Sequence, residues 1–296
     1  MVYLEADKVI YSFSSKHKPA VEVDSGERIE IGVRDAYDRF FQRLPNIKQY
    51  LLYNEKSLSN PATGPIFIRG IKPGDGLDVI IEKVNLSHTG YIAAVKGRGV
   101  LSDTDIEPHL STFSVKQDGL WYQDKIRLRL RPMVGVIGVT PSDFDVLTVD
   151  LGYHGGNLDC NDITAGTTVH FPVYLPGALL AVGDVHASMG FGEVYSGVNI
   201  EASVIIRVER VPKPGWERPW FETASEIMTL GVEDNLEDAI REAALSMTKL
   251  LQYHFTISYS EAISLTGAAC DIRLGQASKF GTKVSAYAVF PKASLF

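Results

Sequence analysis

The stretch DKIRLRLRPMVGVIGVTP, residues 124–141, decides the fold class, because it is rich in valine and isoleucine and ends in a turn signal. Such residues suit a pleated, half-buried strand. Turn residues separate similar stretches at short intervals, which favours sandwich or barrel pieces over βαβ units. We therefore predict a mainly β fold, sandwich-like or barrel-like, with one long helix and a few short ones. The similar stretches are RIEIGV (28–33), GLDVIIEKV (76–84), TTVHFPVYL (167–175), SVIIRVERV (203–211) and KVSAYAVF (283–290).

One strong helix pattern interrupts the strands, in EDNLEDAIREAALSMTKLLQ (233–252). An acidic first turn suits the helix dipole there. A shorter helix is expected around SEAISLTGAA (260–269), with Ser260 as its N-cap. The segment YDRFFQRLPNIKQYLL (37–52) also has a helical pattern, which Pro45 would break. In the long helix the apolar residues recur at spacings of three and four, as an amphipathic helix requires: Leu236, Ile240, Ala243, Met247 and Leu250.

The proline-rich join VPKPGWERPW (211–220) predicts a boundary in the chain. It would separate a β-rich catalytic region, 1–210, from a helix-containing C-terminal region, 211–296, packed on it. A single domain is the alternative, since 296 residues can bury one large core.

Composition narrows the classes of partner. With 29 basic and 36 acidic residues the net charge is -7, which leaves no broad cationic surface for nucleic acid or anionic lipid. The first residues, MVYLEADKVI, lack the apolar segment of a signal peptide. The longest apolar run, 171–182, is broken by proline and glycine and is far shorter than the roughly 20 residues of a membrane helix. Two cysteines fit a reducing compartment. We expect a cytoplasmic protein with no nucleic-acid or membrane partner.

Polar residues with metal-binding chemistry gather between Tyr153 and Glu201. Two polar loops there flank one apolar strand, so they can converge on one edge of a sheet. Histidine and carboxylate ligands together suit zinc, and also accept calcium, manganese or iron. The alternative is that aspartate and asparagine shape ordinary turns while the glycines supply positive φ. The candidates are His154, Asn157 and Asp159 in the first loop and Asp184, His186 and Glu193 in GDVHASMGFGEV (183–194).

These residues lie in stretches that resemble the acetamidase/formamidase family: HGGNLD (154–159), PVYLPGALLAVGDVHASMGFGEV (172–194) and NIEASVIIRV (199–208). The resemblance implies a mainly β fold, hydrolysis of a small amide such as formamide or acetamide to a carboxylate and ammonia, a divalent metal and a homo-oligomer, often a dimer. Weaker similarities follow in the family's order, at 13–40, 60–75, 132–141 and 268–276.

The resemblance also assigns roles to particular residues. Asp35 stands where the family places an aspartate after an early strand, and Phe191 stands where many members carry an acid. A water activated by the metal would attack the amide carbonyl, and Glu193 would carry the proton to the leaving nitrogen. Glu193 is alternatively a metal ligand. Asn157 is the second catalytic residue, and the metal ligands are expected among Asp35, His154, Asp159, Asp184 and His186.

Other chemistries are weighed against the same residues. The chain offers no Ser-Ser-Lys pattern of a serine amidase. Asp159 and Asp162 would raise the pKa of the Cys160 thiol, which makes it a poor nucleophile. A dinuclear metallophosphoesterase would need the Asp-x-His motif first and an α/β scaffold. A non-catalytic β module that binds metal or carbohydrate stays open as the other alternative.

Overall fold

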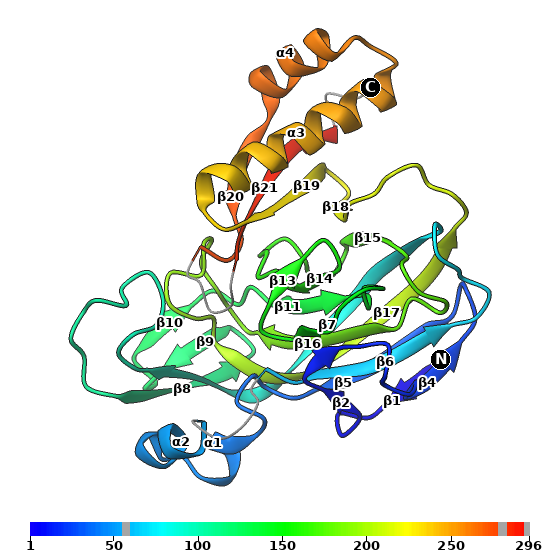
Figure 1. The fold of residues 1–296 in the computed structure, drawn as a ribbon. Helices are drawn as coiled ribbons and strands as arrows, with labels where there is room; N and C mark the ends of the chain where they lie inside the picture. Colours follow the sequence, from blue (N-terminus) through cyan, green and yellow to red (C-terminus); the bar gives the residue numbers. More distant parts are fainter. Residues whose placement is uncertain (55–59, 278–282, 293–296) are drawn as a thin grey trace.

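The computed structural model describes residues 1–54, 60–277 and 283–292, and it confirms the predicted mainly β fold. Nearly all strand pairs are antiparallel; β1 with β5 and β4 with β6 are parallel. Within the described residues the strands form one curled hydrogen-bonded sheet, with β3 and β12 as a separate pair (Figure 1).

The described residues of the first half of the chain form ten strands and two short helices. They are β1 (Val2–Leu4), β2 (Val9–Ile10), β3 (Ser12–Phe13), β4 (Val21–Val23), β5 (Arg28–Val33), α1 (Phe40–Arg43), α2 (Ile47–Asn54), β6 (Ala62–Ile68), β7 (Gly76–Ala94), β8 (His109–Lys116), β9 (Gly119–Tyr122) and β10 (Ile126–Leu128).

In the second half, the part of the chain that the structure describes forms eleven strands and the two longer helices. They are β11 (Met133–Gly138), β12 (Val146–Leu147), β13 (Leu151–Gly152), β14 (Gly155–Asn157), β15 (Thr168–Pro172), β16 (Leu180–His186), β17 (Asn199–Val211), β18 (Trp220–Glu222), β19 (Glu226–Glu233), α3 (Leu236–Phe255), α4 (Tyr259–Ala269), β20 (Asp271–Leu274) and β21 (Val284–Pro291).

The long strands β7 and β17 form the longest paired segment of the sheet. They run antiparallel from the pair Asn199–Tyr91 to the pair Val211–Gly76, and β17 pairs with β5 along its other edge. Alternate side chains of both strands, such as Val79 and Val204, are fully buried in the main core. This ladder supports the strands that carry the polar motifs.

The predicted helices are present, with one corrected boundary. Helix α3 covers β19 and β21 and buries Ala239, Ala243, Met247 and Leu251, whereas Leu236, Ile240 and Leu250 are only partly buried. The N-cap of α4 is Ser258 rather than Ser260, because the Ser258 hydroxyl accepts a hydrogen bond from the Glu261 amide and the Glu261 carboxylate accepts one from the Ser258 amide. The segment 37–52 breaks into α1 and α2 around Pro45, as expected.

The helices lie at two ends of the molecule (Figure 1). Helices α3 and α4 lie with β19, β20 and β21 at one end, and α1 and α2 lie at the other. The proline-rich join 211–220 leads from β17 into β18, which pairs with β15 and with β19. None of the helices in the described ranges has the length and apolar composition needed to cross a membrane.

Two glycines near α3 and α4 give a matched test of this packing. A Cβ on Gly231 would lie 1.9 Å from the Ala239 carbonyl oxygen, whereas one on Gly267 meets no atom within 4 Å. Gly231→Ala should lower the free energy of unfolding by about 1–3 kcal/mol, since it forces α3 off β19. Gly267→Ala should raise it by about 0.5–1 kcal/mol, because alanine favours the helix. Urea unfolding of both variants tests this; equal effects would contradict it.

Candidate active site

The central element of the site is β11, because it hydrogen-bonds both strands that carry the polar motifs. Val136 pairs with Asn157 of β14 on one edge of β11 and with Gly183 of β16 on the other. Asp159 follows β14 directly, and Asp184 and His186 lie within β16. The expectation that these two residues lie in a loop is therefore wrong; the two motifs meet across one strand.

Three of the expected residues come together at this edge. Asp159, His186 and Glu193 each offer one ligand atom, and these atoms lie within 4.8 Å of one another. Their side chains are buried, with exposed fractions of 0%, 1% and 5% for the residues. Glu193 reaches the group from the segment after β16, which Gly192 fastens through its amide to the Leu274 carbonyl (3.0 Å). We call this group the acidic triad.

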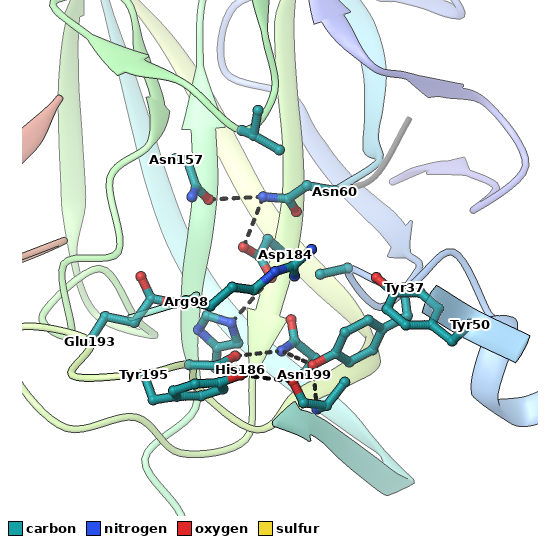
Figure 2. Close-up of a pocket in the computed structure, with 14 residues that line it drawn as sticks. Tyr37, Tyr50, Asn60, Arg98, Asn157, Asp184, His186, Glu193, Tyr195 and Asn199 are labelled. Atoms are coloured by element: carbon teal, nitrogen blue, oxygen red, sulfur yellow. Dashed lines mark hydrogen bonds and ion pairs between the residues drawn. The ribbon is translucent and has the colours of Figure 1, made fainter. Parts of the chain in front are cut away.

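The His186 ring is oriented by a chain of polar side chains. Its Nε2 lies 3.2 Å from Asp184 Oδ1, while Nδ1 lies 3.9 Å from Asp159 Oδ1 and 3.2 Å from Met133 Sδ. Asn60 lies between Asn157 and Asp184, as Figure 2 shows, and its amide donates to both side chains at 3.0 and 3.1 Å. A carboxylate on the far nitrogen is the usual way to hold a metal-binding histidine.

The Asp159 carboxylate has one occupied and one unoccupied hydrogen-bonding position. Its Oδ2 accepts a 2.8 Å bond from Gln276 Nε2, whereas Oδ1 has no hydrogen-bond partner within the part of the chain that is described. Gly135 makes room for Oδ1, since a Cβ there would lie 2.6 Å away. Asp159 Oδ1 thus faces the site as a ligand atom would. Gln276 lies in the family-like stretch 268–276, but it was not among the site residues predicted from the sequence.

Burial and the neighbouring carboxylates make it unfavourable for Asp159 and Glu193 to carry negative charge. Burial, followed by the nearby Asp184 carboxylate, raises the pKa of Asp159 to about 6. Burial also raises the pKa of Glu193 well above its usual range, and Asp159 and Asp184 add to this effect. For His186, burial alone would favour the neutral ring, but Asp184 and Asp159 outweigh it and the pKa is raised. A divalent cation would relieve this repulsion.

Backbone strain is concentrated at the same residues. Asn60, Asp159, Asp184 and Glu193 have φ values of 62°, 47°, 49° and 41°, in the left-handed region that side chains other than glycine rarely adopt. Each such residue costs on the order of 1–3 kcal/mol and persists because its surroundings hold it. Residues in such conformations cluster at functional sites.

Three residues predicted as metal ligands lie outside the triad: Asp184, which contacts His186, and also Asp35 and His154. Asp35 accepts bonds from the backbone amides of Tyr37 (2.8 Å) and Arg39 (3.2 Å), and so shapes the turn before α1. The His154 ring packs edge-on against Phe13 with 5.0 Å between centroids, and burial lowers its pKa to about 4. His154 Nε2 lacks a hydrogen-bond partner among the described residues.

Two further sequence positions are explained by their contacts. Phe191 lies beneath the guanidinium groups of Arg131 and Arg273, 5.0 and 5.8 Å from the ring centre, and makes a cation–π contact with each. Cys160 is fully buried, and burial, with Asp159 and Asp162 adding to it, raises its thiol pKa well above the usual range. The low reactivity predicted for Cys160 therefore agrees with its surroundings.

A pocket opens beside His186 and Glu193 of the triad (Figure 2). It encloses about 80 Å³, room for several waters, since one water needs roughly 10–15 Å³. Its wall includes Asp184, His186 and Glu193 beside Tyr37, Arg98 and Asn199. A molecule of a few non-hydrogen atoms would fill it.

Known proteins share this architecture. A sequence profile of the Acetamidase/Formamidase family matches residues 145–279. The chain is 29% identical over 138 residues to a formamidase of Methylophilus methylotrophus, and this match spans 34% of that protein's length. The crystal structure of an acetamidase from Bacillus halodurans superimposes with a TM-score of 0.93, at 29% identity, over 99% of this chain and 98% of the other.

A second crystal structure shows the same likeness over nearly the whole chain. It is that of a predicted acetamidase/formamidase from Thermoanaerobacter tengcongensis, with 33% identity, a TM-score of 0.91 and coverage of 99% of this chain and 96% of the other. Fold and site together define a mainly β protein of acetamidase-like architecture with a buried histidine and carboxylate centre. The chain belongs to the acetamidase/formamidase family.

The buried carboxyls predict a pH-dependent stability of the metal-free protein. Because the folded pKa values of Asp159 and Glu193 are raised, the folded state binds protons more tightly than the unfolded chain. Its free energy of unfolding should therefore fall as pH rises above about 4, the ordinary carboxyl value, and through the raised pKa values.

Glu193→Gln should weaken this pH dependence, so that the variant is more stable than the wild type at pH 8 in chelator. The exposed Glu217→Gln serves as a control that should change nothing. Urea unfolding between pH 4 and 8 measures the effect. Parallel curves for wild type and Glu193→Gln would show that the Glu193 carboxyl is not a source of the instability.

Proposed function

We propose that this protein is an amidohydrolase that cleaves a short-chain amide, of the formamide or acetamide type, to a carboxylate and ammonia. The observation that carries the proposal is the buried acidic triad beside a small pocket, in a chain of the acetamidase/formamidase family. The activity named for the formamidase and acetamidase relatives supports it.

The triad has the properties of a divalent metal site. It combines one histidine nitrogen with carboxylate oxygens, and Asp159 Oδ1 is buried without a hydrogen-bond partner in the described residues. Such mixed ligands suit zinc first, with calcium and manganese as alternatives. When bound, the ion would polarise the amide carbonyl and make water a better nucleophile.

The chain's own residues then have distinct tasks. Asp159 and the Nδ1 atom of His186 would hold the ion, and Asp184 would orient His186 rather than bind the ion itself. Glu193, whose pKa is raised by burial, is suited to carry a proton to the leaving nitrogen near neutral pH. Asn157 lines the pocket beside Asp184 and would position the amide.

The substrate and the dimer follow from the family resemblance, and the setting and the absence of a nucleic-acid partner follow from the composition. We propose a homodimer in the cytoplasm, with a small amide as substrate and no nucleic-acid partner. The fold argues against a dinuclear metallophosphoesterase. Such an enzyme requires an α/β scaffold, whereas this chain folds as a mainly antiparallel β protein. A module that binds metal without turnover is the remaining alternative, and ammonia release separates the two.

The metal requirement is tested on protein purified without chelator. Elemental analysis should find a divalent ion, and ammonia release from formamide and acetamide should disappear when the ion is stripped and return when it is replaced. Bound metal without ammonia release from any amide would favour the non-catalytic module. Activity that survives complete stripping would remove the metal from the proposal.

The role of Glu193 is tested by Glu193→Gln. As a proton carrier, Glu193 should contribute roughly 10²–10⁴-fold to kcat, so the variant should lose that activity and keep its metal. Loss of metal together with activity would instead make Glu193 a ligand. Glu217→Gln, which alters an exposed carboxylate, should keep both metal and activity.

A further inference from the structure

The pocket also contains a cationic group that the chemistry above does not use. Arg98 lies in the loop between β7 and β8, is half-buried, and lines the pocket with Tyr37 and Tyr50. Its side chain shares a hydrogen bond with Tyr50, but none of the ion pairs formed within residues 1–54, 60–277 and 283–292 involves Arg98. A guanidinium in a pocket wall without a carboxylate partner is unusual, because arginine is normally paired when it leaves bulk water.

The loop around Arg98 is shaped to hold it there. Gly97 and Gly99 flank it with φ values of 84° and 72°. A Cβ on Gly99 would lie 2.7 Å from the Val194 carbonyl oxygen, so only glycine allows this close approach. The Val100 amide donates to the same carbonyl at 2.7 Å. The Arg98 loop is therefore fastened to the segment that follows Glu193.

Tyr37 supplies a second donor in the same pocket. Its hydroxyl accepts hydrogen bonds from the Ala93 amide (2.9 Å) and from Asn199 Nδ2 (3.4 Å), and it donates none within the described residues. Burial raises the phenol pKa, so the proton stays on the oxygen. Edge contacts with Phe41 and Tyr50, at 4.8 and 5.4 Å between ring centres, fix the ring. The Tyr37 proton is thus available to a ligand.

Arg98 is the cationic group nearest the tyrosines of the pocket wall. It lowers the pKa values of Tyr37 and Tyr50, on which the buried Asp35 carboxylate acts in the opposite direction. The carboxylates that line the pocket itself are those of Asp184 and Glu193. We call Arg98 and Tyr37 together the anion subsite.

We propose that the substrate is a short amide that carries a carboxylate at the end away from the scissile bond, and that the anion subsite binds this carboxylate. This inference rests on the proposed function and ranks its substrates: monoamides of short dicarboxylic acids are preferred over neutral short amides such as formamide and acetamide. Arginine with a phenol donor matches a carboxylate in charge and in hydrogen bonding. A neutral amide would leave Arg98 without a counter-charge inside the pocket.

The reaction changes only the amide end of such a substrate. Water adds its oxygen to the acyl carbon, the carbon–nitrogen bond breaks, and the nitrogen leaves as ammonia with the proton taken from water. The product is a dicarboxylate, and its second carboxylate is the one at Arg98. The product of the reaction should therefore bind the anion subsite as well.

Kinetics with matched substrates test the inference. Malonamate and succinamate are compared with the neutral diamides malonamide and succinamide, which have nearly the same size. The wild type should show the higher kcat/KM for the anionic monoamides. Arg98→Gln should lose roughly 10–100-fold on those, mainly through KM, the loss expected for a charge-assisted hydrogen bond. Its kcat/KM for the diamides should change less than about threefold, within the effect of one neutral hydrogen bond.

Two variants control for folding and for general charge. Arg98→Lys keeps the charge without the fork of donors and should recover part of the loss. Lys96→Gln removes an exposed cation from the same loop and should leave all four substrates unaffected. Equal losses on monoamides and diamides in Arg98→Gln, or a wild type that does not discriminate, would overturn the anion subsite while leaving the proposed amide hydrolysis intact.

Binding measured without turnover separates the two proposals. Calorimetric titration with malonate and succinate should show affinities that fall roughly 10–100-fold in Arg98→Gln and by a smaller factor in Tyr37→Phe. Binding that depends on Arg98, with no ammonia from any amide, would support the anion subsite and remove the hydrolytic proposal. Binding that is absent, or equal in wild type and Arg98→Gln, would overturn the subsite whatever the activity.

Discussion

The pairing of β11 with both β14 and β16 is the constraint on which the site depends. Because Val136 lies between Asn157 and Gly183, the residues that follow β14 and those at the end of β16 are held on one side of a single strand. Main-chain hydrogen bonds fix this register, and a slip by one residue would turn Asp184 and His186 to the other face. The long β7 and β17 ladder and the buried core around it keep the three strands in place.

The arrangement of the site lowers the stability of the folded protein. Carboxylates that burial and mutual repulsion destabilise lie on residues with left-handed backbone conformations. Hydrogen bonds from Asn60 and Gln276 hold this arrangement, and glycine at 135 makes the space it needs. A cation of charge two would remove much of the repulsion. The arrangement is thus costly alone and suited to a bound ion, a common trade between stability and function.

The pocket adds selectivity to that chemistry because its wall carries groups of both charges. The triad region contributes the carboxylates of Asp184 and Glu193, and the anion subsite contributes Arg98. A metal at the triad would attract the amide carbonyl, while the guanidinium would attract a distant anion. A substrate with both groups would be oriented by its two ends, which places the scissile bond without a large contact surface.

The sequence by itself determined the local features: strand composition, the two helices expected at 233–252 and 260–269 and observed at 236–255 and 259–269, the break at Pro45, and the two motifs with Asp159, His186 and Glu193. These depend on periodicity, turn chemistry and short motifs, which neighbouring residues encode. Only the tertiary structure decided that Asp35, His154 and Asp184 lie outside the triad, that Gln276 and Asn60 support it, and that Arg98 lines the pocket. Gln276 contacts Asp159 across 117 residues of chain, and Asn60 contacts Asp184 across 124. Sheet order and register create such contacts, and no local pattern in the sequence records them.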